Sequence, residues 1–104
     1  MIKVSVMYPN TKDVNFDRDY YQNKHLTMVS KLVGSALKRL ELDLGIAERN
    51  LAELVPYVAI AHLKFEDIAS FQTAFGSHAA TFAADVKNFS NVQGEIQISD
   101  LVTF

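Results

Sequence analysis

Two side chains that could move a proton lie four residues apart near the start of the chain. The stretch DYYQNKHLTMVSKLVG, residues 19–34, places Tyr21 and His25 on the stripe that a helix would turn towards a core or pocket. An imidazole titrates near neutral pH, so it can act as a general acid or base on a bound molecule. We therefore predict His25 and Tyr21 as catalytic residues, with Tyr21 as an orienting phenol. The alternative for His25 is a structural ring bonded to a backbone carbonyl.

A second histidine lies within an alternating apolar segment. In YVAIAHLKF, residues 57–65, His62 shares one face of a predicted strand with Ile60, and the other face carries the small residues Ala59 and Ala61. Small residues allow a helix to pack closely, which would turn His62 to the opposite side of the sheet. We predict that His62 contacts a ligand there, and the alternative is a structural hydrogen bond at a dimer contact.

The third histidine follows a predicted helix cap. His78 comes directly after Ser77, and the positive end of a helix favours the neutral ring, which can donate or accept a hydrogen bond. We predict a substrate-binding role for His78, and the alternative is a ring that only fills space. Other predicted substrate contacts are Tyr20, Phe75 and Phe82, with Asn88 as a further polar group near the pocket mouth. The alternative for the two phenylalanines is hydrophobic core.

Several kinds of site have no support in the sequence. The three histidines fall on a helix, a strand and a second helix, without the short spacing that preorganises metal ligands, so we predict no metal site. Neither a GxGxxG nor a Walker phosphate loop is present, and we predict no cofactor. No GxSxG nucleophile elbow appears, which disfavours covalent catalysis.

Composition limits the class of protein. The 104 residues form one predicted domain, 1–104. Its composition, with 49% hydrophobic and 21% charged residues, is typical of a globular fold. Ten basic and twelve acidic residues give a formal charge of −2 without a basic run, so nucleic acid is not an expected partner. The chain has no cysteine, no long apolar span and no signal-peptide layout at its start, and we therefore expect a cytoplasmic protein and no membrane partner.

Hydrophobic periodicity predicts the elements that must position these side chains. Alternation predicts strands over 2–8, 39–44, 57–65 and 95–104. Helical spacing predicts helices over 17–34 and 67–87. The second helix is predicted to be interrupted at Gly76, with Ser77 as the N-cap of its second half. The connection 45–56 is predicted to hold one short helical turn. The order βαββαβ predicts an α+β, ferredoxin-like fold, with a four-stranded antiparallel sheet and both helices on one face.

A sheet covered on one face leaves the other face bare. Residues such as Met7, Val58 and Ile60 would then lie in water, which costs about 25 cal/mol per Å² of apolar surface. The simplest cover is a second copy about a two-fold axis. We predict a homodimer packed sheet to sheet, with a small-molecule pocket in each subunit between the sheet and the helices.

Five segments of the chain together resemble the EthD family. In chain order they are KVSVMYPN, DYYQNKHL, PYVAIAHLKF, FQTAFGSHAA and NFSNVQGEIQIS, and they leave out only the connection around residues 45–55. The resemblance implies a dimeric α+β barrel of ferredoxin-like subunits. That superfamily also contains muconolactone isomerases, cofactor-free quinone-forming monooxygenases, polyketide cyclases and dehydratases, and some haem proteins. Members of the family are often labelled as reductases or as proteins of ethyl tert-butyl ether degradation.

These observations favour one function and leave two others open. The leading hypothesis is a protein that binds a small, largely apolar organic molecule and assists its conversion by proton transfer or cofactor-free redox chemistry, in a catabolic or biosynthetic pathway. It would then be an isomerase, a dehydratase or an oxidoreductase. The first alternative is a non-enzymatic carrier or accessory protein of an oxidative degradation pathway. The second is an interaction module whose interior is filled by side chains.

Overall fold

Four strands form one antiparallel sheet in the computed structural model, which describes residues 1–104. In chain order they are β1 (Ile2–Pro9), β2 (Arg39–Leu44), β3 (Tyr57–Phe65) and β4 (Glu95–Asp100). Across the sheet the order is β2-β3-β1-β4, so β3 and β1 are central, and β2 and β4 are the edges. The predicted four-stranded antiparallel sheet is confirmed, although β4 ends four residues earlier than expected.

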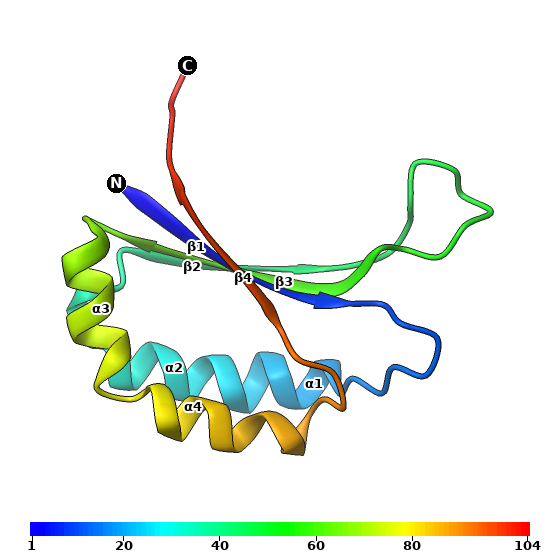
Figure 1. Cartoon of the computed structure of the whole chain (residues 1–104), viewed down its shortest axis with the longest axis horizontal. Coiled ribbons are helices and arrows are strands. Elements are labelled where there is room, and N and C mark those ends of the chain that lie inside the picture. Colours follow the sequence, from blue (N-terminus) through cyan, green and yellow to red (C-terminus); the bar gives the residue numbers. More distant parts are fainter.

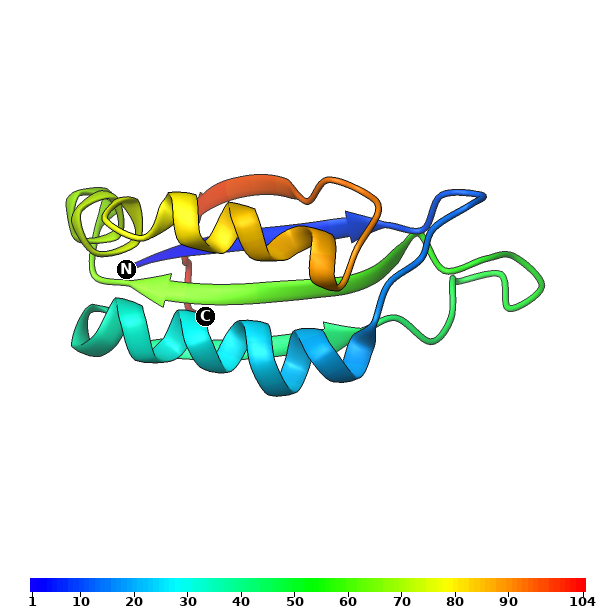
Figure 2. The same cartoon turned by 90° about the horizontal axis from the view of Figure 1, so that it is seen from below.

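Two helical segments connect the strands and lie on the same face of the sheet (Figure 1). The first consists of α1 (Arg18–Tyr20), the π-helical turn η1 (Tyr21–His25), α2 (Leu26–Val33) and the 3₁₀ turn η2 (Gly34–Ala36). The second consists of α3 (Ile68–Gly76), α4 (Ala79–Asp85) and the 3₁₀ turn η3 (Val86–Asn88). Figure 2, seen from the helical side, shows both segments in front of the sheet. The α+β, ferredoxin-like architecture is therefore as predicted.

The ends of the first segment follow from single residues. The side chain of Asp17 accepts a hydrogen bond of 3.0 Å from the backbone N–H of Tyr20, which satisfies one of the free amides of the first turn. Gly34 ends α2 with φ +70°, a backbone conformation that residues with a Cβ rarely adopt. Both boundaries match the predicted helix.

Alternation along β3 separates the two faces of the sheet. Ala59 and Ala61 are fully buried under the helices, whereas Ile60 and His62 point to the open face and are half-buried. The small alanines let the helices approach, as predicted. Val58, which was expected to be bare, is buried.

Two local predictions are wrong. Residues 45–56 contain turns and bends but no helix, and Leu51 there is 81% exposed, so an amphipathic turn would have no surface to pack against. Ser77 does not cap α4, because its hydroxyl donates back to the carbonyl of Thr73 at 2.9 Å, and His78 takes the cap position without a side-chain hydrogen bond. No helix has the length and apolar character needed to span a membrane.

Candidate functional site

A π-helical turn brings Tyr21 and His25 together. The backbone N–H of Leu26 bonds to the carbonyl of Tyr21, an i→i+5 bond, where an α-helix would form an i→i+4 bond. The rings of Tyr21 and His25 stack at a centroid distance of 5.4 Å and an angle of 14°. They are only 1% and 6% exposed, respectively. Single π turns occur often at functional sites, and this one holds the two residues that the sequence singles out.

Asp85, at the end of α4, fixes the imidazole from the other helical segment. Its Oδ2 lies 2.8 Å from His25 Nδ1. Its Oδ1 accepts two further hydrogen bonds, from the Tyr20 hydroxyl at 2.7 Å and from the Asn88 amide at 2.9 Å. The carboxylate is therefore held on both oxygens by three donors.

These contacts determine the charge of Asp85 and the tautomer of His25. Burial of Asp85 opposes its ionisation, but the hydrogen bonds from Asn88, Tyr20 and His25 outweigh burial and hold the pKa of the carboxyl below its ordinary value. An ionised carboxylate only accepts hydrogen bonds, so the neutral imidazole carries its hydrogen on Nδ1. The nitrogen left for a bound molecule is Nε2, which can accept a proton.

A cavity of about 260 Å³ lies between the helices and the sheet beside this ring. Of its 15 lining residues 12 are hydrophobic, and they come from β1, β3, β4 and both helical segments. His25 and Gln93 are the polar side chains of the wall apart from the tyrosines. The volume is close to the lower bound of about 300 Å³ for drug-sized ligands, so the cavity fits a compact, mostly apolar molecule.

Two buried phenols complete the wall. Burial raises the pKa of Tyr8 to about 12, and it raises the pKa of Tyr21 further. Both hydroxyls therefore stay protonated across the physiological range and act as hydrogen-bond donors, not as bases. Among the side chains that line the cavity, His25 is the one that can accept a proton near neutral pH.

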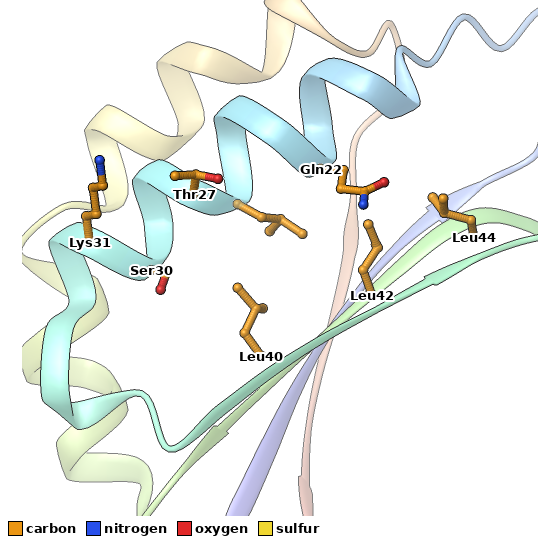
Figure 3. A pocket seen from close by; sticks show the side chains of 8 residues that line it. Gln22, Thr27, Ser30, Lys31, Leu40, Leu42 and Leu44 are labelled. Atoms are coloured by element: carbon orange, nitrogen blue, oxygen red, sulfur yellow. The ribbon is translucent and has the colours of Figure 1, made fainter.

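A larger and wider hollow of about 470 Å³ lies on the other side of Leu26, between the first helical segment and the edge strand β2 (Figure 3). Its floor consists of leucines on β2, and the helix presents neutral polar groups and one lysine above them. Figure 3 shows Leu40, Leu42 and Leu44 on the strand and Gln22, Thr27, Ser30 and Lys31 on the helix, with the Lys31 side chain extending away from the leucines. No imidazole or carboxylate lines this hollow, so it lacks a group that could transfer a proton near neutral pH.

The structure brings together some of the predicted site residues and separates others. Tyr21, His25, Phe75 and Phe82 line the 260 Å³ cavity. Tyr20 does not line it, and its hydroxyl bonds to Asp85, which in turn contacts His25.

The other two histidines lie outside this cavity. His62 is on the open face of the sheet, where its Nε2 lies 2.7 Å from Asp43 Oδ2, so it cannot contact the molecule that His25 contacts in the same subunit. His78 is half-buried next to Phe82, with 6.0 Å between the ring centroids, and it does not line the cavity. No three histidine or acidic side chains come together as a set of metal ligands.

Asp85, Tyr8 and Gly94 were not predicted as site residues. Asp85 carried one signal, since it lies three residues after Phe82 and so falls near the inward stripe of the helix, where a carboxylate needs a partner. Tyr8 is the last residue of the inward face of β1. Gly94 lines the cavity just before β4 and showed no signal in the sequence.

The chain was compared with known families, curated proteins and solved structures. The EthD domain family matches residues 11–93. No curated protein matches the chain. An EthD-like protein from Ralstonia eutropha JMP134 is 31% identical, with a TM-score of 0.93 over 98% of this chain and 92% of that one.

Two more distant structures share the fold. An ethyl tert-butyl ether degradation (EthD) family protein from Bacillus halodurans C-125 is 15% identical, with a TM-score of 0.76 over 98% of this chain and 99% of that one. HapK from Hahella chejuensis is 16% identical, with a TM-score of 0.63 over 100% of this chain and 95% of that one. At such low identity these similarities establish the fold and not the reaction.

Proposed function

Because the chain belongs to the EthD domain family, we propose that it binds a compact, largely apolar organic molecule in the cavity beside His25 and assists its conversion by proton transfer. The observation that supports this proposal most is the 2.8 Å contact between His25 Nδ1 and Asp85 Oδ2 at the wall of that cavity. The carboxylate fixes the tautomer of the ring, and it would stabilise the imidazolium that a general base forms.

In the proposed step, Nε2 of His25 takes a proton from an acidic C–H or O–H bond of the ligand. The bonding pair stays on the ligand as an anion, and the imidazolium is stabilised by the Asp85 carboxylate. Return of the proton to a different atom completes an isomerisation, and loss of a hydroxide that takes up the same proton completes a dehydration. Oxidation by dioxygen would begin with the same deprotonation.

Deuterium exchange tests this function without knowledge of the natural substrate. Small cyclic ketones with acidic α-hydrogens, such as 1-indanone and cyclohexanone, are incubated with the protein in D₂O and followed by proton NMR. We expect exchange above the buffer rate for at least one ketone, and a loss of about 100-fold or more in His25→Gln, which is the usual contribution of a general base. His78→Gln is the matched control, because His78 does not line the cavity.

The outcome also separates an enzyme from a carrier. Saturable binding of the ketone by the wild type, with no exchange at any pH between 5 and 9, would refute proton transfer and favour the carrier. Exchange that is equal in His25→Gln and in the wild type would refute the role of His25.

We further propose that two copies pack through the open face of the sheet, which bears no helix (Figure 1). Two ion pairs on this face are formed within the chain, Lys64 with Glu41 at 3.3 Å and His62 with Asp43 at 2.7 Å, which lowers the cost of removing water from these four groups.

A further inference from the structure

The side of the cavity formed by Tyr8, Tyr21 and Gly94 indicates which chemical class the ligand belongs to. We propose that the ligand carries an oxygen that becomes negatively charged in the reaction, as in an enolisable ring ketone or a phenol, and that the Tyr8 hydroxyl donates a hydrogen bond to this oxygen. The inference rests on the proposed function, because it names the substrate class of the same site. It also assigns Tyr8 as a substrate-contacting residue.

The ring of Tyr8 is held firmly by other aromatic rings. Its centroid lies 5.0 Å from that of Phe16, 5.3 Å from that of Tyr21 and 5.7 Å from that of Phe89. The residue is 4% exposed, and its backbone pairs with Ala59 in the centre of the sheet. A donor fixed in this way loses little side-chain entropy when it binds an anion, and such preorganisation makes electrostatic stabilisation effective.

Gly94 packs closely against the hydroxyl end of that ring. A Cβ atom at position 94 would lie 3.1 Å from Tyr8 Cζ, the carbon that bears the hydroxyl, and 3.1 Å from Cγ1 of Val6. Tyr8, Gly94 and Val6 all line the cavity. The absence of a side chain at position 94 therefore lets the backbone before β4 hold the Tyr8 ring in place within the cavity wall.

The Tyr8 phenol is neutral when a ligand binds. Burial raises its pKa to about 12, so the hydroxyl keeps its hydrogen near neutral pH and can donate it to a ligand oxygen.

This donor completes the charge balance of the proposed step. When His25 Nε2 takes a proton from the carbon next to a carbonyl, the C–H electron pair forms the C=C bond of an enolate and the carbonyl π pair moves onto oxygen. With a phenol the O–H pair stays on oxygen directly. In a cavity lined mainly by apolar side chains, that oxygen needs a donor from the protein, because water is a poor competitor there.

The size of the cavity limits the ligand further. A cavity of about 150 Å³ suffices for benzene in other proteins. The 260 Å³ found beside His25 therefore fits one substituted ring or a small fused pair. The substrate class that results is a compact cyclic ketone or a phenol, with its oxygen near Tyr8 and its acidic hydrogen near His25.

Binding of 4-nitrophenol, compared with nitrobenzene, tests this inference. The two probes have nearly the same shape, and only the first can present an oxyanion. We expect the wild type to bind 4-nitrophenol at least 10-fold more tightly than nitrobenzene and to hold it as the yellow phenolate below the pKa of the free probe. Tyr8→Phe should weaken nitrophenol binding about 10-fold, as expected for a hydrogen bond to a charged group, and leave nitrobenzene binding within about twofold.

Tyr57→Phe is the matched control, because it removes a hydroxyl that is outside the cavity. Equal affinity of the wild type for the two probes would overturn the inference, and this measurement needs no variant. An unchanged preference for nitrophenol in a folded Tyr8→Phe would overturn it as well. Deuterium exchange remains a separate readout: exchange without a Tyr8 effect refutes only the oxyanion contact, and a Tyr8 effect without exchange refutes only the catalytic function.

Discussion

Nδ1 of His25 lies 2.8 Å from Oδ2 of Asp85, across 60 residues of sequence. This contact joins the π-helical turn of the first helical segment to the end of α4. The second carboxylate oxygen is occupied by the Tyr20 hydroxyl and the Asn88 amide, so the carboxylate cannot rotate without losing both bonds. The orientation of the imidazole in the cavity therefore depends on how the two helical segments pack.

Asp85→Asn should lower the rate of deuterium exchange about 100-fold in a folded protein. The Tyr20 and Asn88 donors require an oxygen at the Oδ1 position, so the new amide nitrogen has to face His25 Nδ1. Nδ1 then accepts a hydrogen bond, the ring hydrogen moves to Nε2, and the base is lost. The exchange assay and ¹⁵N NMR of the His25 ring, which reports the tautomer, measure this change.

The control for this substitution is Asp13→Asn, which removes an exposed carboxylate on a turn. It should change neither the rate nor the His25 spectrum. If Asp85→Asn kept the hydrogen on Nδ1 and the rate of the wild type, the carboxylate would not position the ring.

Acid should destabilise the protein in part through Asp85. The folded pKa of this carboxyl lies below its ordinary value of 3.8, so its ionisation stabilises the fold above that value and the contribution is lost as the pH falls through the folded pKa. We expect the free energy of unfolding, measured by urea denaturation between pH 2 and 6, to fall more steeply with decreasing pH in the wild type than in Asp85→Asn. If the free energy of unfolding changed with pH in the same way in both proteins, the neighbours of Asp85 would not lower the pKa of its carboxyl.

The fold was predictable because each element buries one face. The alternation of YVAIAHLKF identifies the covered and open faces of β3, and Asp17 and Gly34 identify the ends of the first helical segment. The helix expected in 45–56 was wrong because helical spacing stabilises a helix only when a surface is there to bury its apolar side chains. Leu51 and Leu54 are 81% and 75% exposed.

The site was predictable only in part. The stripe through Tyr21 and His25 identified a helix face that lines the cavity, but hydrophobic spacing does not reveal the i→i+5 backbone bond that stacks the two rings. Asp85 could not be assigned to His25, because their pairing depends on the packing of two distant helical segments. For His62 the alternation correctly placed the side chain on the face of the sheet opposite the helices. The sheet therefore lies between His62 and the cavity beside His25.

Ile60→Lys should convert the proposed dimer into a monomer. Ile60 lies on the open face of the central strand β3, opposite Met7 of β1, so a lysine there would place an unpaired charge in the middle of the contact between two sheets. Sedimentation equilibrium at micromolar concentration measures the change in mass. Ile46→Lys, at a residue that is 92% exposed in the connection after β2, is the control and should remain dimeric. A wild type that sediments as a monomer would contradict the proposed dimer.

Phe82→Ala should cost about 3–5 kcal/mol of stability, the usual range for removal of a buried aromatic ring. Phe82 is 4% exposed, and its ring lies 4.9 Å from that of Phe75 and 6.4 Å from that of His25. Urea denaturation gives the free energy of unfolding. Phe104→Ala, at the fully exposed C-terminal residue, should leave it unchanged within about 0.5 kcal/mol. A loss below about 1 kcal/mol for Phe82→Ala would mean that this wall of the cavity is not packed as described.

Tyr8→Phe should make the protein more resistant to alkali. The pKa of Tyr8 is raised from 10.0 to about 12 in the fold, mainly by burial, so the neutral phenol stabilises the folded state below pH 10 and this contribution disappears as the pH rises to 12. Between these values the unfolded chain releases one proton that the folded chain retains, which corresponds to about 1.4 kcal/mol of stability lost per pH unit. Without that phenol the dependence of the unfolding free energy on pH should become less steep by about this amount. Phe104→Ala is the control, because it changes an exposed residue and removes no ionisable group. Equal slopes for the wild type and Tyr8→Phe would show that the Tyr8 hydroxyl is solvated, and it would then be no better than water as a donor to a bound oxyanion.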